Sequence, residues 1–192
     1  VHLETQWNMP KGKKISDYTI ATQILNPEGK QVNADTRPGN ELDETLFAQD
    51  FVVRNPKLWS VEYPHLYTAV SKIYEGDRLV DEYTTRFGIR TLEIIPEKGF
   101  FLNGKLTKFK GVCNHHDLGP LGAAVNDAAI RRQIRIMKDM GANAIRTSHN
   151  MPAPELVEAC DEMGMMLMLE SFDEWKSAKV GNGYHKIFDE WV

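Results

Sequence analysis

The sequence predicts two regions of different class: a β-sandwich over residues 1–94, followed by the first strands and helices of a (β/α)8 barrel over residues 95–192. In the first region, short segments of alternating apolar and polar residues are separated by turn residues, as in antiparallel sandwiches. In the second, strand-like and helix-like segments follow one another in turn, as in parallel sheets. Because a closed barrel has eight strands and roughly 250 residues, we expect only its beginning here.

The strands of the sandwich are predicted from their period and from the turns between them. Every second residue over 18–24 is aromatic, isoleucine or threonine, which is the period of a half-buried strand. The turn Asn-Pro-Glu-Gly at 26–29 returns the chain. Trp59 is expected to be buried. Further strands are predicted over residues 30–35, 46–54, 66–74 and 78–85.

The helices of the barrel region have clear start and stop signals. Asn126 or Asp127 can cap a first helix, which Gly141 can end in the left-handed conformation. Pro154 favours the first position of a second helix, and Gly164 closes it. The predicted apolar faces are Ile130, Ile134, Met137 and Met140 in the first helix and Leu156, Val157, Cys160 and Met163 in the second.

Three barrel strands are predicted around these helices, over residues 109–113, 142–146 and 165–169. The third is apolar throughout, which predicts a strand covered on both faces. Asn103-Gly104 predicts a hairpin ahead of the first strand. Residues 187–192 resemble the opening of a further helix.

Composition limits the classes of function. The 192 residues carry a net charge of -4, with 42% hydrophobic and 26% charged residues, so no nucleic-acid partner is predicted. No apolar run approaches the ~18 residues of a spanning helix, so no membrane partner is predicted either. Two cysteines indicate no disulfide framework. The first residues do not read as a signal peptide, and the compartment stays open.

Polar residues follow each predicted barrel strand. Because parallel strands end at one edge of a sheet, these side chains are expected to meet there. Imidazole and guanidinium donors beside carboxylates suit a ring of sugar hydroxyls. The residues concerned are His115, His116 and Asp117 after the first strand, Arg146, His149 and Asn150 at the second, and Glu170, Asp173, Glu174 and Trp175 after the third.

Other roles for these residues are also compatible with the sequence. Paired carboxylates could be a glycosidase acid and base, or they could cap the following helix. Arg146 could be a structural ion-pair partner. A metal-dependent barrel hydrolase would use His115, His116, His149 and Asp173.

Two further chemistries are disfavoured by the pattern. No glycine-flanked elbow surrounds Ser148, as a hydrolase nucleophile of that type requires. Cys113 lacks the paired ligand spacing of a structural zinc site.

Several segments, in this order, are similar to the family 2 glycoside hydrolases, which include β-galactosidases, β-glucuronidases and β-mannosidases. The resemblance covers nearly the whole chain and implies an immunoglobulin-like sandwich followed by the start of a catalytic TIM barrel. It also implies a retaining cleavage of terminal β-glycosides, with β-galactosides as the first choice. The segments are NPKLWS (55–60), PHLY (64–67), RFGIR (86–90), FLNGK (101–105), KGV (110–112) and MKDMGANAIRTSHN (137–150).

The resemblance also implies roles for single residues. The acid/base and nucleophile glutamates of the family lie in later parts of the barrel, so no catalytic residue is assigned within the chain, which is expected to be inactive alone. His115 and His149 would bond to sugar hydroxyls, and Arg146 would orient carboxylates. The implied substrate-binding set is His115, Arg146, His149, Asn150, Glu170, Asp173 and Trp175.

The chain departs from the family pattern at two places. Leu169 stands where the family often has an aspartate. Some members bind magnesium through a glutamate and a histidine; Glu174 matches the first position, but Lys176 occupies the second and would repel a cation. We therefore expect no metal and no cofactor.

Outside enzymes, the competing hypothesis is a non-catalytic carbohydrate-binding or protein-interaction module. In it, the exposed strand edges of an incomplete barrel would favour self-association.

Overall fold

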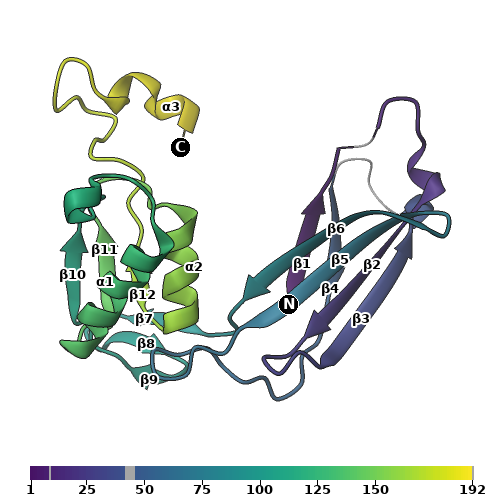
Figure 1. Ribbon diagram of the computed structural model, residues 1–192, viewed down its shortest axis with the longest axis horizontal. Helices are drawn as coiled ribbons and strands as arrows, with labels where there is room; N and C mark the ends of the chain where they lie inside the picture. Colours follow the sequence, from purple (N-terminus) through teal and green to yellow (C-terminus); the bar gives the residue numbers. More distant parts are fainter. Residues whose placement is uncertain (9, 42–45, 192) are drawn as a thin grey trace. The chain divides into compact units, whose positions relative to one another are not determined.

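The computed structural model of the chain describes residues 1–8, 10–41 and 46–191, which form two compact units (Figure 1). The sandwich unit comprises Val1–Trp59 and His65–Arg90, and the barrel unit comprises Ser60–Pro64 and Thr91–Val192. The short segment Ser60–Pro64 belongs to the barrel unit, where Lys138 Nζ donates to the carbonyl of Val61 at 3.2 Å.

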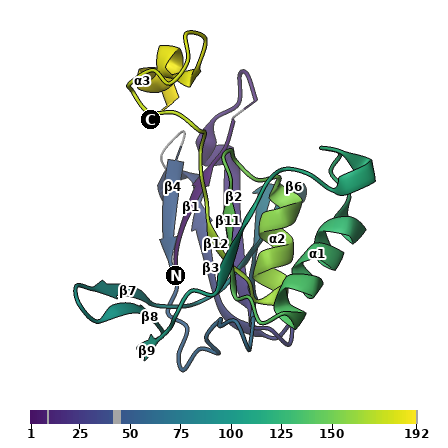
Figure 2. The same ribbon diagram turned by 90° about the vertical axis from the view of Figure 1, so that its left-hand side faces the viewer.

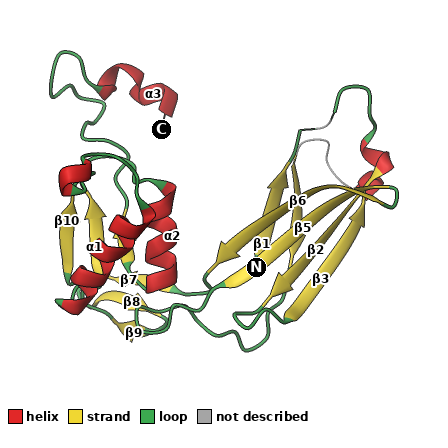
Figure 3. Ribbon diagram, viewed as in Figure 1, coloured by secondary structure: helices red, strands yellow, loops and turns green. Residues whose placement is uncertain are grey.

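The sandwich unit consists of strands in two antiparallel sheets, drawn in yellow in Figure 3. One sheet pairs β1 with β4, and the other has the order β3-β2-β5-β6. Short 3-10 helices occupy Ile15–Asp17 and Gly39–Glu41. The strands are β1 (His2–Gln6), β2 (Tyr18–Leu25), β3 (Gln31–Pro38), β4 (Leu46–Asp50), β5 (Tyr67–Glu75) and β6 (Arg78–Phe87). The predicted strands are confirmed, although β4 ends four residues before the predicted position, and β1 was not predicted.

The core of the sandwich follows the alternation of β2. Ile20 and Ile24 are fully buried, and the polar Thr22 between them donates a 2.7 Å hydrogen bond to the buried Gln49 of β4. This bond joins the two sheets, and the Gln49 NH2 group donates in turn to Asp35 at 3.2 Å, so the buried polar groups are paired. Trp59 is buried as predicted, with the Arg90 guanidinium 5.1 Å from its ring.

The barrel unit contains two three-stranded sheets. The antiparallel sheet β7-β8-β9 contains the predicted hairpin, where Asn103 and Gly104 have φ of 53° and 74°. The parallel sheet β10-β11-β12 is built from the predicted strand–helix–strand–helix–strand series. The elements are β7 (Leu92–Ile95), β8 (Gly99–Leu102), β9 (Lys105–Leu106), β10 (Gly111–Asn114), α1 (Asp127–Asp139), β11 (Ala144–Thr147), α2 (Pro154–Met163), β12 (Met166–Met168) and α3 (Phe188–Trp191), with 3-10 turns at Gly119–Leu121 and Tyr184–Ile187. β7 and the 3-10 turn Gly119–Leu121 were not predicted.

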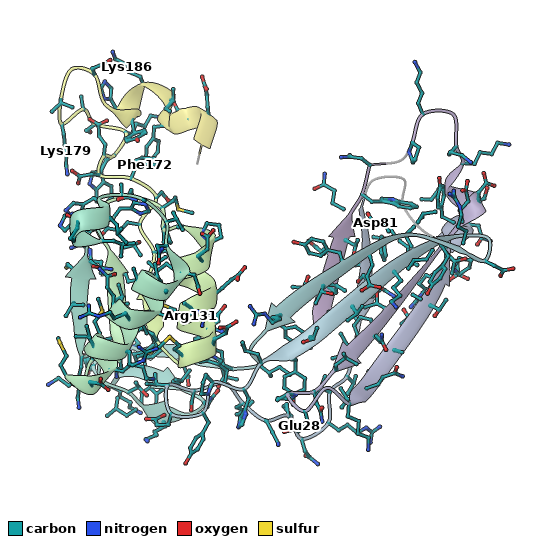
Figure 4. The ribbon with its side chains drawn as sticks, viewed as in Figure 1. Glu28, Asp81, Arg131, Phe172, Lys179 and Lys186 are labelled. Carbon is teal, nitrogen blue, oxygen red and sulfur yellow. The ribbon has the colours of Figure 1, made fainter. Side chains whose placement is uncertain are left out.

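The two crossover helices begin at the predicted residues and lie side by side (Figure 2); α2 ends at the predicted residue, and α1 ends one residue early. Asn126 caps α1 by accepting a 3.0 Å hydrogen bond from the N–H of Ala129. Gly164 ends α2 with φ of 71°. Met140 was expected on the apolar face of α1, but it lies one residue past the helix and is 65% exposed. Arg131 of α1, labelled in Figure 4, bonds to Glu162 of α2 at 2.6 Å.

Both helices cover the same face of the parallel sheet. Val112, Ile145 and Leu167 form one row across the three strands and pack with Ile134 and Cys160 of the helices. The next row has the opposite parity and consists of Cys113, Arg146 and Met168. We call these the covered face and the open face.

The prediction that residues 165–169 are covered on both faces holds at the start of the segment and is wrong at its end. Met165 and Met166, of opposite parity, are 2% and 9% exposed, whereas Met168 and Leu169 are 59% and 53% exposed. An apolar run shows that a strand is compatible with burial, but it does not show how far along the strand the covering extends.

The last described element, α3, lies within the predicted helix 187–192, of which residue 192 is outside the described residues. In the described ranges, no helix combines the length and apolar character needed to cross a bilayer.

Candidate functional site

The three parallel strands end at one edge of their sheet, which is the upper edge of the barrel unit in Figure 1. The predicted polar residues lie at or after this edge. Arg146 lies on β11, in register with Cys113 and Met168 of the open face. His149 and Glu170 lie in the segments that follow β11 and β12. The topology therefore brings residues from all three strand ends together.

Arg146, His149 and Glu170 form the centre of the site, which we call the Glu170 cluster. The Glu170 carboxylate accepts a hydrogen bond from Arg146 Nε, and its other oxygen lies 3.0 Å from His149 Nδ1. The backbone N–H of Glu170 donates to Thr147 Oγ1 at 3.0 Å, which fixes the start of the segment after β12.

The Glu170 carboxylate is held in its ionised form. Burial by itself would raise its pKa, but the hydrogen bonds from His149 and Arg146 outweigh burial, so the pKa lies below its usual value. The side chains of Arg146 and His149 keep about two fifths of their surface exposed (42% and 39%). The cluster thus combines a fixed carboxylate with two donors that face solvent.

Further residues surround the cluster. The ring of His115 packs edge-on against that of His149, with centroids 5.4 Å apart. Asp173 lies 3.9 Å from His149 Nδ1 and 2.7 Å from Lys179 Nζ. The hydrogen bond from Lys179 lowers the pKa of Asp173. Arg146 Nη1 also approaches Cys113 Sγ at 3.7 Å.

Two of the predicted site residues do not join these contacts. The side-chain amide of Asn150 donates to the carbonyl of Met151 at 2.9 Å, and the Asn150 backbone pairs with Phe172. Trp175 is 74% exposed. The structure therefore brings together His115, Arg146, His149, Glu170 and Asp173, and leaves Asn150 and Trp175 at the periphery.

His116 and Asp117 lie in the loop after β10. Together with His115 they line a small cavity of about 40 Å³, whose other walls include Ile130 and Leu156. Ser148 is 2% exposed, and its hydroxyl has no hydrogen-bond partner in the described part of the chain. A nucleophile needs access to substrate and an adjacent base, so the geometry gives Ser148 no such role.

The residues do not fit a metal ion. Within residues 1–8, 10–41 and 46–191, no three His, Cys, Asp or Glu side chains come together as a ligand group. Each oxygen of Glu174 accepts a backbone N–H at 2.7 Å, one from Lys179 and the other from His185. Lys176 forms an ion pair with Asp189 at 2.7 Å. The glutamate at the magnesium position of some family members is therefore already surrounded by N–H donors.

Sequence reasoning missed Lys179, which pairs with Asp173. It named Glu174 as a candidate but missed that this residue organises the segment that carries both. The residues around Lys179 show no helix or strand period, so its position near the site could not be predicted from such a pattern. The only available signal was the pair of glycines, Gly181 and Gly183, which predicts a compact loop.

Comparisons with known proteins agree with this architecture. Residues 2–90 match the profile described as "Glycosyl hydrolases family 2", and residues 94–189 match "Glycosyl hydrolases family 2, TIM barrel domain". These two matches confirm the fold class of a sandwich followed by the start of a TIM barrel.

Curated relatives and solved structures are similar over most of the chain. The chain is 47% identical over 176 residues to "Beta-galactosidase BoGH2A" from Bacteroides ovatus, covering 90% of this chain and 21% of that protein. It is 36% identical over 132 residues to a beta-glucuronidase from Streptococcus agalactiae, covering 69% and 21%. A crystal structure of a glycosyl hydrolase family 2 member from Bacteroides cellulosilyticus superposes with a TM-score of 0.81 at 36% identity, covering 90% and 23%.

The chain therefore spans about a fifth of the length of these relatives. The segments that carry the resemblance, the order of the two units and the two profile matches lead to one assignment. The chain belongs to family 2 of the glycosyl hydrolases.

Proposed function

We propose that this chain is part of a retaining glycosidase that cleaves terminal β-glycosides, with β-galactosides preferred, and that the Glu170 cluster binds the sugar. The observation that carries the proposal is the solvent-facing cluster of Arg146, His149 and Glu170 at the strand ends of a family 2 chain. In this proposal, residues 1–94 are the sandwich domain and residues 95–192 are the first part of the catalytic barrel.

Each predicted residue receives a role from its position. His115 and His149 bond to sugar hydroxyls, and Arg146 orients the Glu170 carboxylate that it contacts. The exposed ring of Trp175 can stack on a sugar face at the rim, a role that its exposure permits. Asn150 and Asp173 complete the rim around the sugar.

The catalytic pair is proposed to lie outside these 192 residues. A retaining glycosidase uses two carboxyl groups, one of which must hold a proton near neutral pH as the general acid. Glu170 and Asp173 both have pKa values below the usual range, because cationic side chains bond to them. Neither is suited to donate a proton, so both are assigned to binding.

The charge balance of the site favours a neutral sugar. Arg146 and His149 contact Glu170, and Lys179 contacts Asp173. A glucuronide carries a carboxylate. To bind here, this carboxylate would have to take Arg146, His149 or Lys179 away from Glu170 or Asp173, or it would be repelled by these two acids. A galactoside carries only hydroxyl groups, which can use the donors that remain.

The test is an assay of the protein translated from the full reading frame that contains this chain. We expect hydrolysis of p-nitrophenyl β-galactoside with retained anomeric configuration by NMR, and a lower kcat/KM for the β-glucuronide. The 192-residue chain by itself should be inactive. Inversion, or preference for the glucuronide, would contradict the corresponding part of the proposal.

Glu170→Gln in the same protein tests the binding site. Arg146 and His149 contact different oxygens of Glu170, so the amide would turn its NH2 donor toward one of them, and kcat/KM should fall by about 10²-fold. Glu155→Gln, an exposed position on α2, is the matched control and should change kcat/KM less than twofold. An unchanged kcat/KM in Glu170→Gln would remove Glu170 from the site.

A further inference from the structure

The segment that carries Asp173 and Trp175 has almost no regular secondary structure. It runs over residues 169–183, from the end of β12 to the 3-10 turn Tyr184–Ile187, and we call it the Glu174 loop. Long loops without secondary structure hold a single conformation only if their own side chains pack them or bond to their backbone.

The Glu174 carboxylate supplies this internal support. Its side chain is 4% exposed. One oxygen accepts the N–H groups of Lys179 at 2.7 Å and Val180 at 3.4 Å. The other accepts the N–H of His185 at 2.7 Å and lies 3.1 Å from the ring Nδ1 of the same residue. One carboxylate therefore ties together backbone positions five to eleven residues further along the chain.

The loop is shaped around this carboxylate. A Cβ atom at Gly183 would lie 2.0 Å from an oxygen of Glu174, so glycine at this position leaves room for the carboxylate. On the other side of the loop, Phe172 stacks on Tyr184 with centroids 5.2 Å apart and meets Phe188 edge-on at 6.0 Å. Phe172 and Lys179 are labelled in Figure 4. Aromatic packing of Phe172 therefore connects the beginning of the loop to the residues that follow it, and Glu174 bonds to the backbone between them.

Contacts lead from the loop to the Glu170 cluster. The backbone of Lys179 is held by Glu174, and its Nζ reaches Asp173 at 2.7 Å. Asp173 in turn lies 3.9 Å from His149 Nδ1. The position of an acid at the rim of the cluster thus depends on a carboxylate that faces away from it.

We infer that Glu174 is a positioning residue, which holds Lys179 and Asp173 in place at the edge of the Glu170 cluster and thereby sets the affinity of the site for its sugar. This inference rests on the proposed function. Glu174 touches no reacting group; it acts through the loop.

The ionisation of Glu174 agrees with this role. The hydrogen bond from the N–H of His185, helped by the further donors, lowers the pKa of Glu174 to about 2. A carboxyl whose pKa is depressed on folding stabilises the folded state above its unfolded pKa, and that contribution is lost as pH falls through the folded pKa. The loop should therefore stay ordered at neutral pH and loosen only as pH falls toward 2.

Glu174→Gln in the full-length protein tests the inference. Its amide NH2 must point at one set of N–H donors, so the loop should loosen. We expect KM for the galactoside to rise by about tenfold while kcat changes less than threefold, because ground-state and transition-state binding are lost together. Glu190→Gln, an exposed glutamate of α3, is the matched control and should leave both constants unchanged.

Amide hydrogen exchange over residues 176–186, measured by mass spectrometry, gives a readout that does not need activity. Exchange at Lys179, Val180 and His185 should accelerate by about tenfold or more in Glu174→Gln. Unchanged exchange, or faster exchange with an unchanged KM, would overturn the inference. A wild-type protein that cleaves no β-glycoside would instead overturn the proposed function, and the exchange result would still stand as a separate measurement.

Gly183→Ala provides a second variant in case Glu174→Gln does not fold. It keeps the Glu174 side chain but brings a methyl group within 2.0 Å of a carboxylate oxygen, so the carboxylate must shift away from its N–H donors. The same rise in KM and in loop exchange is expected, whereas a merely structural role would lower the melting temperature without changing KM. Gly181→Ala, where a Cβ meets no atom within 4 Å, is its control.

Discussion

The covered and open faces of the parallel sheet are built from the same three strands, yet they differ in almost every property. On the covered face, Ile145 is fully buried between Val112, Leu167 and the two crossover helices. On the open face, Arg146 takes part in the Glu170 cluster, and Met168 is mostly exposed. Side chains alternate along a strand, so a single residue step separates the core from the site.

The difference shows how the fold divides its tasks. Burial of a side chain such as Ile145 contributes roughly 1.5–3 kcal/mol to folding, so the covered face stabilises the unit. The open face contributes little to folding, and its side chains are free to be chosen for chemistry. Substitutions on the two faces should therefore change different measurements.

The largest expected difference is in the reactivity of the two cysteines. Cys113 is exposed on the open face, whereas Cys160 of α2 is buried against the covered face. Burial raises the pKa of the Cys160 thiol to about 12. Since only the thiolate reacts, iodoacetamide at pH 8 should modify Cys160 about a thousandfold more slowly than Cys113.

Mass spectrometry of the modified peptides in the 192-residue chain would measure both rates. In guanidinium chloride the two rates should become similar, since unfolding removes the protection. Similar rates in the folded chain would show that α2 does not pack on the sheet as described.

A smaller effect, in stability, is expected from truncating one side chain on each face. Ile134→Ala, at a fully buried position of α1, should lower the free energy of unfolding by about 3 kcal/mol through lost burial and a cavity. Met168→Ala on the open face should cost less than about 1 kcal/mol. Urea unfolding followed by circular dichroism at 222 nm reports on the barrel unit, which contains α1 and α2. Equal losses would mean that both faces are covered in solution.

The covered face was largely predictable from the sequence because local signals specify it. Asn126 at a helix start, Pro154 at a first helical turn and Gly164 at a helix end each act over a few residues. The apolar period of the helices identified Ile130, Ile134 and Cys160 as core residues. On this face the local sequence signals and the burial of the side chains agree, so the signals predict which residues form the core.

The open face was less predictable because its arrangement depends on distant partners. Glu170 and Glu174 are four residues apart and look alike in the sequence. In the structure, Glu170 meets the side chains of another strand end, while Glu174 turns inward to backbone N–H groups of its own loop. Which donors a carboxylate finds is decided by loop geometry, and no sequence period encodes that geometry. The same reason explains the error at Met168, since an apolar run does not show what covers it.

The smallest expected effect is a change in stability at the N-termini of the two helices that form the covered face. Asn126 caps α1 with its side chain, whereas Ala153 at the equivalent position of α2 has none to offer. Asn126→Ala should therefore cost about 1 kcal/mol, and Ala153→Ser, at an extended N-cap residue, should gain up to about 1 kcal/mol. Asn126→Asp, which keeps the acceptor, is the control and should change stability by less than about 0.5 kcal/mol. If Asn126→Ala were neutral in urea unfolding while Ile134→Ala stayed costly, packing of the covered face would alone determine where α1 begins, and the cap would be a consequence of the fold rather than one of its causes.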